Sequence, residues 1–258
     1  MQLELNGKSV LITGGSKGIG LASALQFSRD GAHPIIVSRL KSNLQSALAV
    51  FTEERLPPPV TIELDLSEKG ASEKLFKLAP NPDILINNAG AIPGGSIHEI
   101  DEERWRSTWE LKLFGYINMT RLYLKMMENR ESGVICNIIG LAGVAPRYDY
   151  ICGSTANAAL IAFTKGIGGT SVNKGVRVFG INPAPTRSDR MKGMLEKQAQ
   201  DTLGDASRWS ELIQKSPMGR LAEPDEIARV VVFGCSPLSG YISGSVFNID
   251  AGQIYAAR

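Results

Sequence analysis

A regular alternation of short apolar runs and helix-length amphipathic segments constrains the fold of this chain more than any other feature. The apolar runs are rich in valine and isoleucine, as strands covered on both faces are. Alternation of strands and helices produces right-handed crossovers and therefore one parallel sheet. The predicted strands are Ser9–Ile12, Pro34–Val37, Val60–Leu64, Ile84–Ile86, Val134–Ile138, Val176–Ile181 and Ser245–Ile249. The predicted helices lie near Ile19–Asp30, Asn43–Glu54, Glu68–Leu78, Glu102–Asn129, Ala156–Val172 and Asp225–Phe233.

These elements predict an α/β fold, a doubly wound Rossmann-type parallel sheet of about seven strands with helices on both faces. The Pro57–Pro59 run is too short for a linker, so we expect one domain over residues 1–258. Ligands of such sheets bind beyond the carboxyl ends of the strands. The loops that follow these strand ends are therefore expected to carry the chemistry.

Residues 187–218 form the longest connection and contain two helix-like pieces, Met191–Ala199 and Ser207–Lys215. Long loops at strand ends often cover binding pockets. We expect this segment to be a lid over a substrate pocket. The alternative is a helical insertion that only covers the edge of the sheet.

The composition excludes several classes of protein. The 28 lysines and arginines against 26 aspartates and glutamates give a formal net charge of +2, with no basic stripe for nucleic acid. No apolar run approaches the roughly 18–20 residues of a membrane span, and the start lacks the apolar core of a signal peptide. Three separated cysteines and two histidines indicate neither a disulfide framework nor a metal site. We expect a metal-free cytoplasmic protein that binds neither nucleic acid nor membrane.

A glycine-rich turn, Thr13-Gly14-Gly15-Ser16-Lys17-Gly18-Ile19-Gly20, joins the first predicted strand to the first predicted helix. Glycines let the backbone turn tightly and approach a pyrophosphate at a helix N-terminus, where free N–H groups and the helix dipole favour anions. The spacing differs from the Gly-x-Gly-x-x-Gly dinucleotide fingerprint, so an ordinary turn is the alternative. The candidate nucleotide-binding residues here are Gly14, Ser16, Lys17, Gly18, Ile19 and Gly20.

The end of the second predicted strand bears on the choice of nucleotide. Ser38 and Arg39 stand where a protein that binds NAD(H) places an acidic residue for the ribose 2′-hydroxyl. Arginine forms bidentate hydrogen bonds with phosphate, and Lys17 lies in the neighbouring loop. The sequence therefore favours NADP(H) over NAD(H). The alternative is that both cations are solvated surface side chains.

Several further motifs follow in a fixed order along nearly the whole chain. They are Asn-Asn-Ala-Gly at Asn87–Gly90, the tail Pro217–Ala228, and Asp250-Ala251-Gly252. Together with the glycine-rich turn, they resemble the short-chain dehydrogenase/reductase family. The resemblance implies hydride transfer between a nicotinamide and an alcohol or carbonyl compound, usually in tetramers. It also implies that the cofactor is bound by Asp65, Leu66, Asn87, Ala89, Gly90, Pro183, Thr186 and Ser188.

The family resemblance also implies a catalytic serine, tyrosine and lysine and a helix asparagine, and this chain departs from all four. On the surrounding motifs, Gly140 aligns with the serine, Gly153 with the tyrosine, Asn157 with the lysine and Lys112 with the asparagine. A tyrosine with a pKa near 10 needs a neighbouring cation to act as an acid at neutral pH. The proton-transfer residues must therefore be sought elsewhere.

Lysine and asparagine both occur, but on exchanged helices. We predict that the Lys112 ammonium projects toward the space of the missing lysine and that Asn157 bonds a ribose hydroxyl. Tyr150, rather than Tyr148, is expected to swing over Gly153 as the replacement acid. The alternative is that Lys112 reaches solvent and the two tyrosines pack in a loop.

Three functions stay open. The first is an NADP(H)-dependent oxidoreductase with rearranged catalytic residues, acting on a hydrophobic or cyclic small molecule. The second is a non-catalytic NADP(H)-binding protein, either a sensor or an inactive oligomer partner, and the third is non-redox chemistry such as elimination or isomerisation. We expect a homotetramer or homodimer. The predicted wall of the substrate pocket is Leu141, Val144, Tyr150, Pro185, Met191 and Met194.

Overall fold

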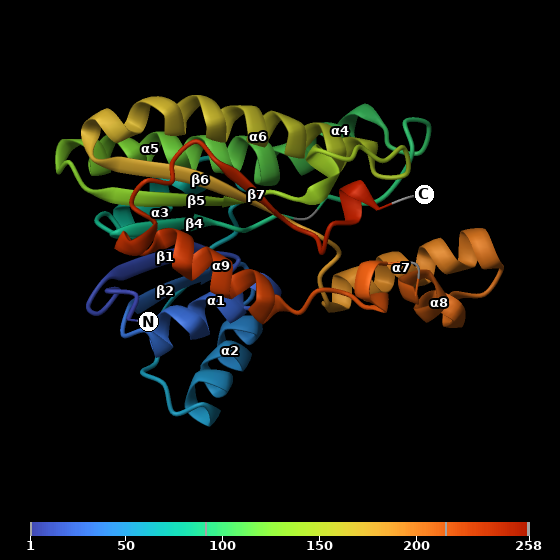
Figure 1. Ribbon diagram of the computed structural model, residues 1–258, viewed down its shortest axis with the longest axis horizontal. Helices are drawn as coiled ribbons and strands as arrows, with labels where there is room; N and C mark the ends of the chain where they lie inside the picture. Colours follow the sequence, from blue (N-terminus) through green and yellow to red (C-terminus); the bar gives the residue numbers. More distant parts are fainter. Residues whose placement is uncertain (1, 91, 215, 257–258) are drawn as a thin grey trace.

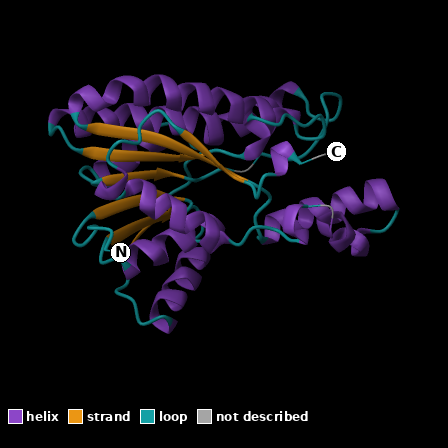
Figure 2. Ribbon diagram, viewed as in Figure 1, coloured by secondary structure: helices purple, strands orange, loops and turns teal. Residues whose placement is uncertain are grey.

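The computed structural model describes residues 2–90, 92–214 and 216–256. Seven parallel strands form one sheet in the order β3-β2-β1-β4-β5-β6-β7, with helices on both sides (Figure 2). The predicted doubly wound α/β fold is confirmed, and the strand order reverses between β1 and β4. The strands are β1 (Ser9–Thr13), β2 (His33–Ser38), β3 (Val60–Glu63), β4 (Ile84–Asn87), β5 (Gly133–Ile138), β6 (Val176–Pro183) and β7 (Val246–Ile249).

Alternate residues of the strands build two cores. Ile12 and Ile36 share a core with α1, α2 and α9, whereas Leu11 and Val37 share the opposite core with α3 and α5. Figure 1 shows α4, α5 and α6 on one side of the sheet and α1, α2 and α9 on the other. The α-helices are α1 (Gly18–Arg29), α2 (Lys41–Glu53), α3 (Ala71–Leu78), α4 (Glu102–Trp109), α5 (Gly115–Asn129), α6 (Ile151–Ser171), α7 (Asp189–Leu203), α8 (Trp209–Gln214) and α9 (Pro224–Cys235).

The predicted strand ends agree with the observed ones to within two residues, and two of the helices differ most from expectation. The helix expected over Glu102–Asn129 is interrupted by a π-helical turn, η1 (Glu110–Phe114). Helix α6 begins at Ile151, five residues earlier than predicted, so that Gly153 lies in its first turn. Glycine is a weak helix former, and burial of Cys152 in an apolar cluster outweighs that preference.

Helices α7 and α8 form an excursion that projects away from the sheet (Figure 1). Its two stems are joined at the base, where Arg187 N–H donates to the Ala222 carbonyl at 2.8 Å and Ala222 N–H donates to the Pro185 carbonyl at 3.1 Å. Lys215, the predicted end of the second helical piece, lies outside the described residues. Within the described ranges, no helix combines the length and the apolarity needed to cross a membrane.

Helix α6 packs directly on the backbone at Gly168. A Cβ atom there would lie 2.3 Å from the Gly244 nitrogen and 2.4 Å from the Val178 carbonyl oxygen. We expect G168A to lower the free energy of unfolding by ~1–3 kcal/mol, because backbone must move to admit the methyl group. Urea unfolding measures the change.

Gly166 provides the matched control on the same helix. Apart from the neighbouring backbone of its own helix, no atom of the described residues lies within 4 Å of a Cβ placed at Gly166. G166A should therefore raise the free energy of unfolding by roughly 0.5–1 kcal/mol through helix propensity alone. Changes of the same sign in the two variants would contradict this account of α6 packing.

Candidate active site

The turns after β1 and β4 are joined by the side chain of Thr13. Its Oγ1 donates to the Ile86 carbonyl at 3.2 Å and accepts from the backbone N–H groups of Asn88 and Ala89 at 2.9 and 3.0 Å. The Asn88 side-chain amide in turn donates to the carbonyl oxygens of Thr13 and Gly14 at 3.0 and 3.1 Å. These bonds hold the glycine-rich turn against the segment that follows β4.

The glycine-rich turn ends in an uncapped helix N-terminus. Gly14 has a φ of +65°, and a Cβ on Gly20 would lie 2.3 Å from the Gly14 carbonyl oxygen, so both positions require glycine. Lys17 precedes α1 in an extended conformation, and no side chain caps the helix. The Cβ position of Gly18 faces open space. Free N–H groups beside open space fit a phosphate group.

Two cationic side chains lie in the adjacent loops. The Ser16 hydroxyl donates to the Ser38 hydroxyl at 3.0 Å and so joins the loop of Lys17 to that of Arg39. Lys17 and Arg39 are both exposed, and neither forms an ion pair with a carboxylate in the described ranges. Both cations are therefore available to an anionic ligand.

Other residues predicted to bind the nucleotide are held by the protein itself. Asp65 accepts two hydrogen bonds from Ser67, which hold the pKa of the Asp65 carboxyl below its usual range, with a smaller contribution from Arg39. Asn87 is fully buried, and its Nδ2 donates to Asn137 Oδ1 at 2.9 Å. Asn87 Oδ1 is a buried acceptor without a hydrogen-bond partner. Two further residues that were predicted to bind the nucleotide pack against the cores of the sheet. Ile19 packs against the core that contains Ile12, and Leu66 packs against the core that contains Leu11.

The segment after β6 carries two hydroxyl groups with local partners. β6 ends at Pro183, and Thr186 Oγ1 donates to the Ala184 carbonyl at 2.8 Å. Ser188 caps α7, since its Oγ accepts from the Met191 N–H at 3.1 Å. The Ser188 hydroxyl therefore fixes where the excursion begins.

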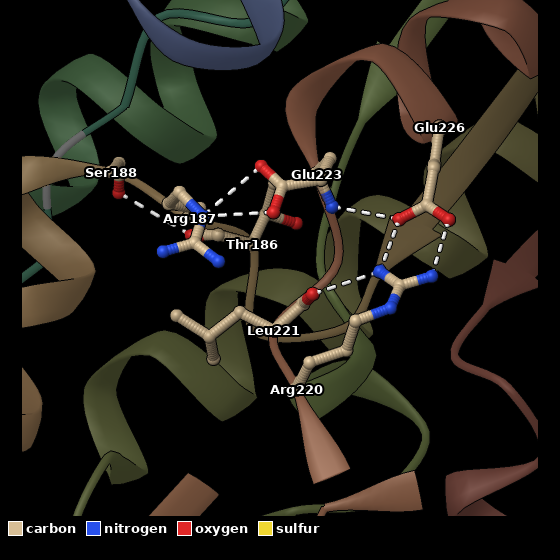
Figure 3. A network of polar contacts seen from close by, with 7 residues as sticks. All are labelled: Thr186, Arg187, Ser188, Arg220, Leu221, Glu223 and Glu226. Atoms are coloured by element: carbon tan, nitrogen blue, oxygen red, sulfur yellow. Dashed lines mark hydrogen bonds and ion pairs between the residues drawn. The ribbon is translucent and has the colours of Figure 1, made fainter. Parts of the chain in front are cut away.

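Two arginine–glutamate pairs secure the base of the excursion (Figure 3). Arg187 Nε donates to the two oxygens of Glu223 at 2.8 and 3.1 Å, and Arg220 donates to both oxygens of Glu226 at 2.7 Å. The Arg220 hydrogen bonds lower the pKa of the Glu226 carboxyl to about 2. Because that carboxylate also accepts from the Glu223 N–H at 2.8 Å, the same network fixes the start of α9.

Lys112 lies within the π-helical turn between α4 and α5. Such turns occur frequently at functional sites. Only 8% of Lys112 is exposed, and its Nζ donates to the Ile138 carbonyl at 2.6 Å and to Tyr116 Oη at 2.9 Å. Tyr116 Oη donates to the same carbonyl at 2.9 Å. The amine therefore points away from solvent, to the carboxyl end of β5.

Burial determines the charge of Lys112. Removal from water lowers the pKa of the Lys112 amine to about 7, and the positive charge of Arg190 adds to the effect. Burial also raises the pKa of Tyr116 well above its usual value. Near neutral pH, Lys112 is therefore a mixture of amine and ammonium, and Tyr116 is a neutral phenol.

The ring of Tyr150 fills the space beside Gly153. A Cβ on Gly153 would lie 2.1 Å from Cε1 and Cζ of Tyr150 and 2.6 Å from its Oη. The ring also packs against an apolar cluster that includes Ile92 and Cys152. Tyr148, by contrast, is 62% exposed. Tyr150 can thus lie here only because residue 153 has no side chain.

Asn157 faces Gly140 in a similar way. Asn157 is 3% exposed, and its Oδ1 is a buried acceptor without a hydrogen-bond partner. A Cβ on Gly140 would lie 2.7 Å from Asn157 Nδ2, and the φ of +148° at Gly140 also favours glycine. The side chains of Lys112 and Asn157, from different helices, therefore converge on the Ile138–Gly140 segment.

Arg190, in the first turn of α7, reaches the segment that follows β4. Its two Nη atoms donate to the carbonyl oxygens of Gly90 at 3.3 Å and Ile92 at 2.6 Å. Lys112 also packs on Gly90, because a Cβ there would lie 2.6 Å from Lys112 Cδ. Gly90 is therefore contacted by the side chains of both Lys112 and Arg190.

A small cavity lies beside one residue of the predicted apolar pocket wall. A cavity of about 110 Å³ lies beside the segment after β6, and of the six predicted wall residues only Pro185 lines it. Val144 is 45% exposed, and Met194 contacts Gly94, with its Cε 3.8 Å from a Cβ position there. The predicted wall stays a prediction.

Comparison with known proteins identifies the family. The model of the short chain dehydrogenase family matches residues 8–199. The chain belongs to this family. It is 30% identical over 257 residues to a 3-oxoacyl-(acyl-carrier-protein) reductase of Thermotoga maritima, covering 98% of this chain and all of that one. It is 29% identical to an acetoacetyl-CoA reductase of Shinella zoogloeoides, covering 95% and 98% of the two chains.

A solved structure agrees over the whole length. L-sorbose reductase from Gluconobacter frateurii, complexed with NADPH and L-sorbose, superposes with a TM-score of 0.88 at 28% identity, with both chains fully covered. Short-chain dehydrogenases use NAD(P), and two observations in this chain fit such a cofactor. The N-terminus of α1 is uncapped, and Asn157 presents a buried acceptor that a ribose hydroxyl would satisfy. In the described ranges, no cluster of histidine, cysteine and acidic side chains is arranged to hold a metal ion.

Sequence reasoning missed four residues of this short-chain dehydrogenase site. Thr13 and Asn88 lie inside the motifs, but their hydrogen bonds depend on the pairing of β1 with β4. Tyr116 follows Lys112 by four residues, and that helical spacing could have indicated the contact. Arg190 gave no sequence signal, because its partners lie about a hundred residues away.

The depressed pKa of Lys112 predicts a pH-dependent effect of K112M on stability. The unfolded chain keeps this proton up to about pH 10.5, whereas the folded chain releases it near pH 7. Burial of the charge therefore destabilises the wild type fully below pH 7, and the penalty is relieved as the pH rises, at ~1.4 kcal/mol per pH unit. K112M should gain most over the wild type at low pH, and this gain should shrink by several kcal/mol toward pH 10.

Urea unfolding at a series of pH values measures this difference. K165M is the matched control, because Lys165 is an exposed lysine of α6. Its difference from the wild type should stay flat over the same range. A flat difference for K112M would show that Lys112 keeps its charge in the folded protein.

Proposed function

We propose that this short-chain dehydrogenase is an NADP(H)-dependent oxidoreductase for an alcohol or carbonyl compound, with its catalytic residues rearranged. Lys112, Tyr150 and Asn157 take the place of the residues that the family pattern leads one to expect. The observation that carries the proposal is the Tyr150 ring beside Gly153. The phenol of Tyr150 thus lies next to residue 153, the position that aligns with the catalytic tyrosine of the family.

The three residues would divide the chemistry as follows. The bound nicotinamide supplies or accepts the hydride. The Tyr150 hydroxyl exchanges the proton with the substrate oxygen, and Asn157 Oδ1 accepts a hydrogen bond from a ribose hydroxyl. The phenols of Tyr150 and Tyr116 interact electrostatically, and Tyr116 is bonded to Lys112, which therefore supplies the nearby positive charge and the mobile proton.

The preference for NADP(H) rests on the two unpaired cations. A 2′-phosphate is a dianion that a guanidinium binds in bidentate fashion, and Arg39 and Lys17 occupy neighbouring loops joined by the Ser16–Ser38 hydrogen bond. The L-sorbose reductase that resembles this chain was crystallised with NADPH. The remaining cofactor residues predicted from the sequence complete the proposed nucleotide site.

R39A should weaken NADPH binding by ~10–100-fold and leave NADH binding unchanged, because only NADPH carries the 2′-phosphate. Fluorescence titration with each nucleotide measures both affinities. R121A is the control, since Arg121 is an exposed cation of α5 that already pairs with Glu73. Equal loss for both nucleotides, or none, would contradict the assignment of Arg39.

Y150F and G153A should each lower the rate of NADPH-dependent carbonyl reduction by ~10²–10⁴-fold, since one removes the phenol proton and the other displaces the ring. Y148F, at the exposed tyrosine two residues away, should retain activity. A panel of aldehydes and ketones, cyclic compounds included, provides the substrate. Full reductase activity of Y150F together with loss of activity in Y148F would contradict the assignment and make Tyr148 the proton donor.

A second candidate is a non-catalytic NADP(H)-binding protein. It is favoured by the hydrogen bonds of Lys112 Nζ to the Ile138 carbonyl and Tyr116 Oη, because they hold the amine on groups of the protein itself. NADPH binding without turnover of any carbonyl compound would support it. One domain over residues 1–258, a lid over residues 187–218, a homotetramer or homodimer and a cytoplasmic location stay predictions.

A further inference from the structure

Lys112 is the only charged side chain among the buried residues of the described ranges. The other buried polar residues are all serine, threonine or asparagine. A buried ammonium without a counter-charge costs several kcal/mol, and proteins retain such groups mainly where they have a use. The burial of Lys112 therefore calls for a chemical explanation.

No counter-charge stabilises the ammonium form. No carboxylate in the described ranges forms an ion pair with Lys112. The charged group that acts on it is Arg190, which bears the same sign. Desolvation and a neighbouring cation are the two means by which proteins convert a lysine into a nucleophile. Together they bring the pKa of Lys112 to about 7, where a large fraction is free amine.

The hydrogen bonds of Lys112 leave its nitrogen one position free. Lys112 Nζ donates two hydrogen bonds, one to the Ile138 carbonyl and one to Tyr116 Oη. In the neutral amine, both bonds persist and the lone pair takes the remaining position. Tyr116 Oη is itself anchored on the Ile138 carbonyl, so the nitrogen is held in a fixed orientation.

The side chain of Lys112 lies against the segment that follows β4. The Lys112 stem packs on Gly90, a partly exposed residue of the segment that follows β4. A side chain at residue 90 would collide with that stem, at 2.6 Å from Cδ. The lysine therefore adjoins a segment at the carboxyl end of β4, the edge where parallel sheets bind their ligands.

We propose that Lys112 is a nucleophilic amine that captures small aldehydes and ketones reversibly as a Schiff base, a covalent activity separate from hydride transfer. The lone pair of Nζ attacks the carbonyl carbon, a C–N bond forms, and the C=O π pair moves to oxygen. A proton passes from nitrogen to that oxygen, for which Tyr116 Oη is the adjacent carrier. Loss of one water then gives the C=N bond, with no oxidant or reductant consumed.

Reductive trapping tests the proposal without any nucleotide. The whole protein is incubated at neutral pH with propanal and cyanoborohydride, which reduces an imine to a stable propyl-lysine, and the modified peptides are quantified by mass spectrometry. Lys112 should be labelled at least ~10-fold faster than an exposed lysine such as Lys165, because more of it is free amine. K112M should lose this one label and keep the others.

The test compares two lysines of the same molecule, so it does not depend on a variant that must fold. In denatured protein, Lys112 and Lys165 should be labelled equally, which calibrates detection of both peptides. Labelling of native Lys112 no faster than Lys165 overturns the proposal, whether the cause is its charge or its inaccessibility. Because no nucleotide is present, this outcome is independent of NADPH binding and of carbonyl reduction.

Discussion

Every polar group of the candidate site depends on one constraint, that all seven strands run in the same direction. Parallel pairing gathers the carboxyl ends of the strands at one edge. The register of β1 and β4 places Ile12 opposite Ile86, so Thr13 and Asn88 meet although they are 75 residues apart. The same direction brings the end of β5 to the helices that carry Lys112 and Asn157. The topology of the sheet thus determines where the site lies, whichever side chains occupy it.

Three glycines then determine which side chains enter this edge. Gly90, Gly140 and Gly153 each leave a volume that a single neighbour occupies. The occupants are the stem of Lys112, the amide of Asn157 and the ring of Tyr150. These glycines and their neighbours are therefore not independent of one another, since each added Cβ would displace a side chain from another position. Substitutions within such pairs are expected to be non-additive.

The sequence was sufficient for whatever depends on local periodicity. The strands, most of the helices and the doubly wound parallel sheet follow from the apolar pattern. The π-helical turn was not predictable, because apolar spacing through Glu102–Asn129 reads as one helix. The partners of Arg190 required the path of the whole chain. The direction in which the α7–α8 excursion projects was not predictable either, since it is set by the base of the excursion and not by its own residues.

The joined base of the α7–α8 excursion has a consequence for how this protein can change. Backbone hydrogen bonds from Arg187 to Ala222 and from Ala222 to Pro185 close the two stems where they leave the body. The free energy of closing a loop grows only with the logarithm of its length. Residues can therefore be added to or removed from the excursion without altering the sheet or the nucleotide turn. Evolution can vary the length of this segment as a module on an unchanged framework.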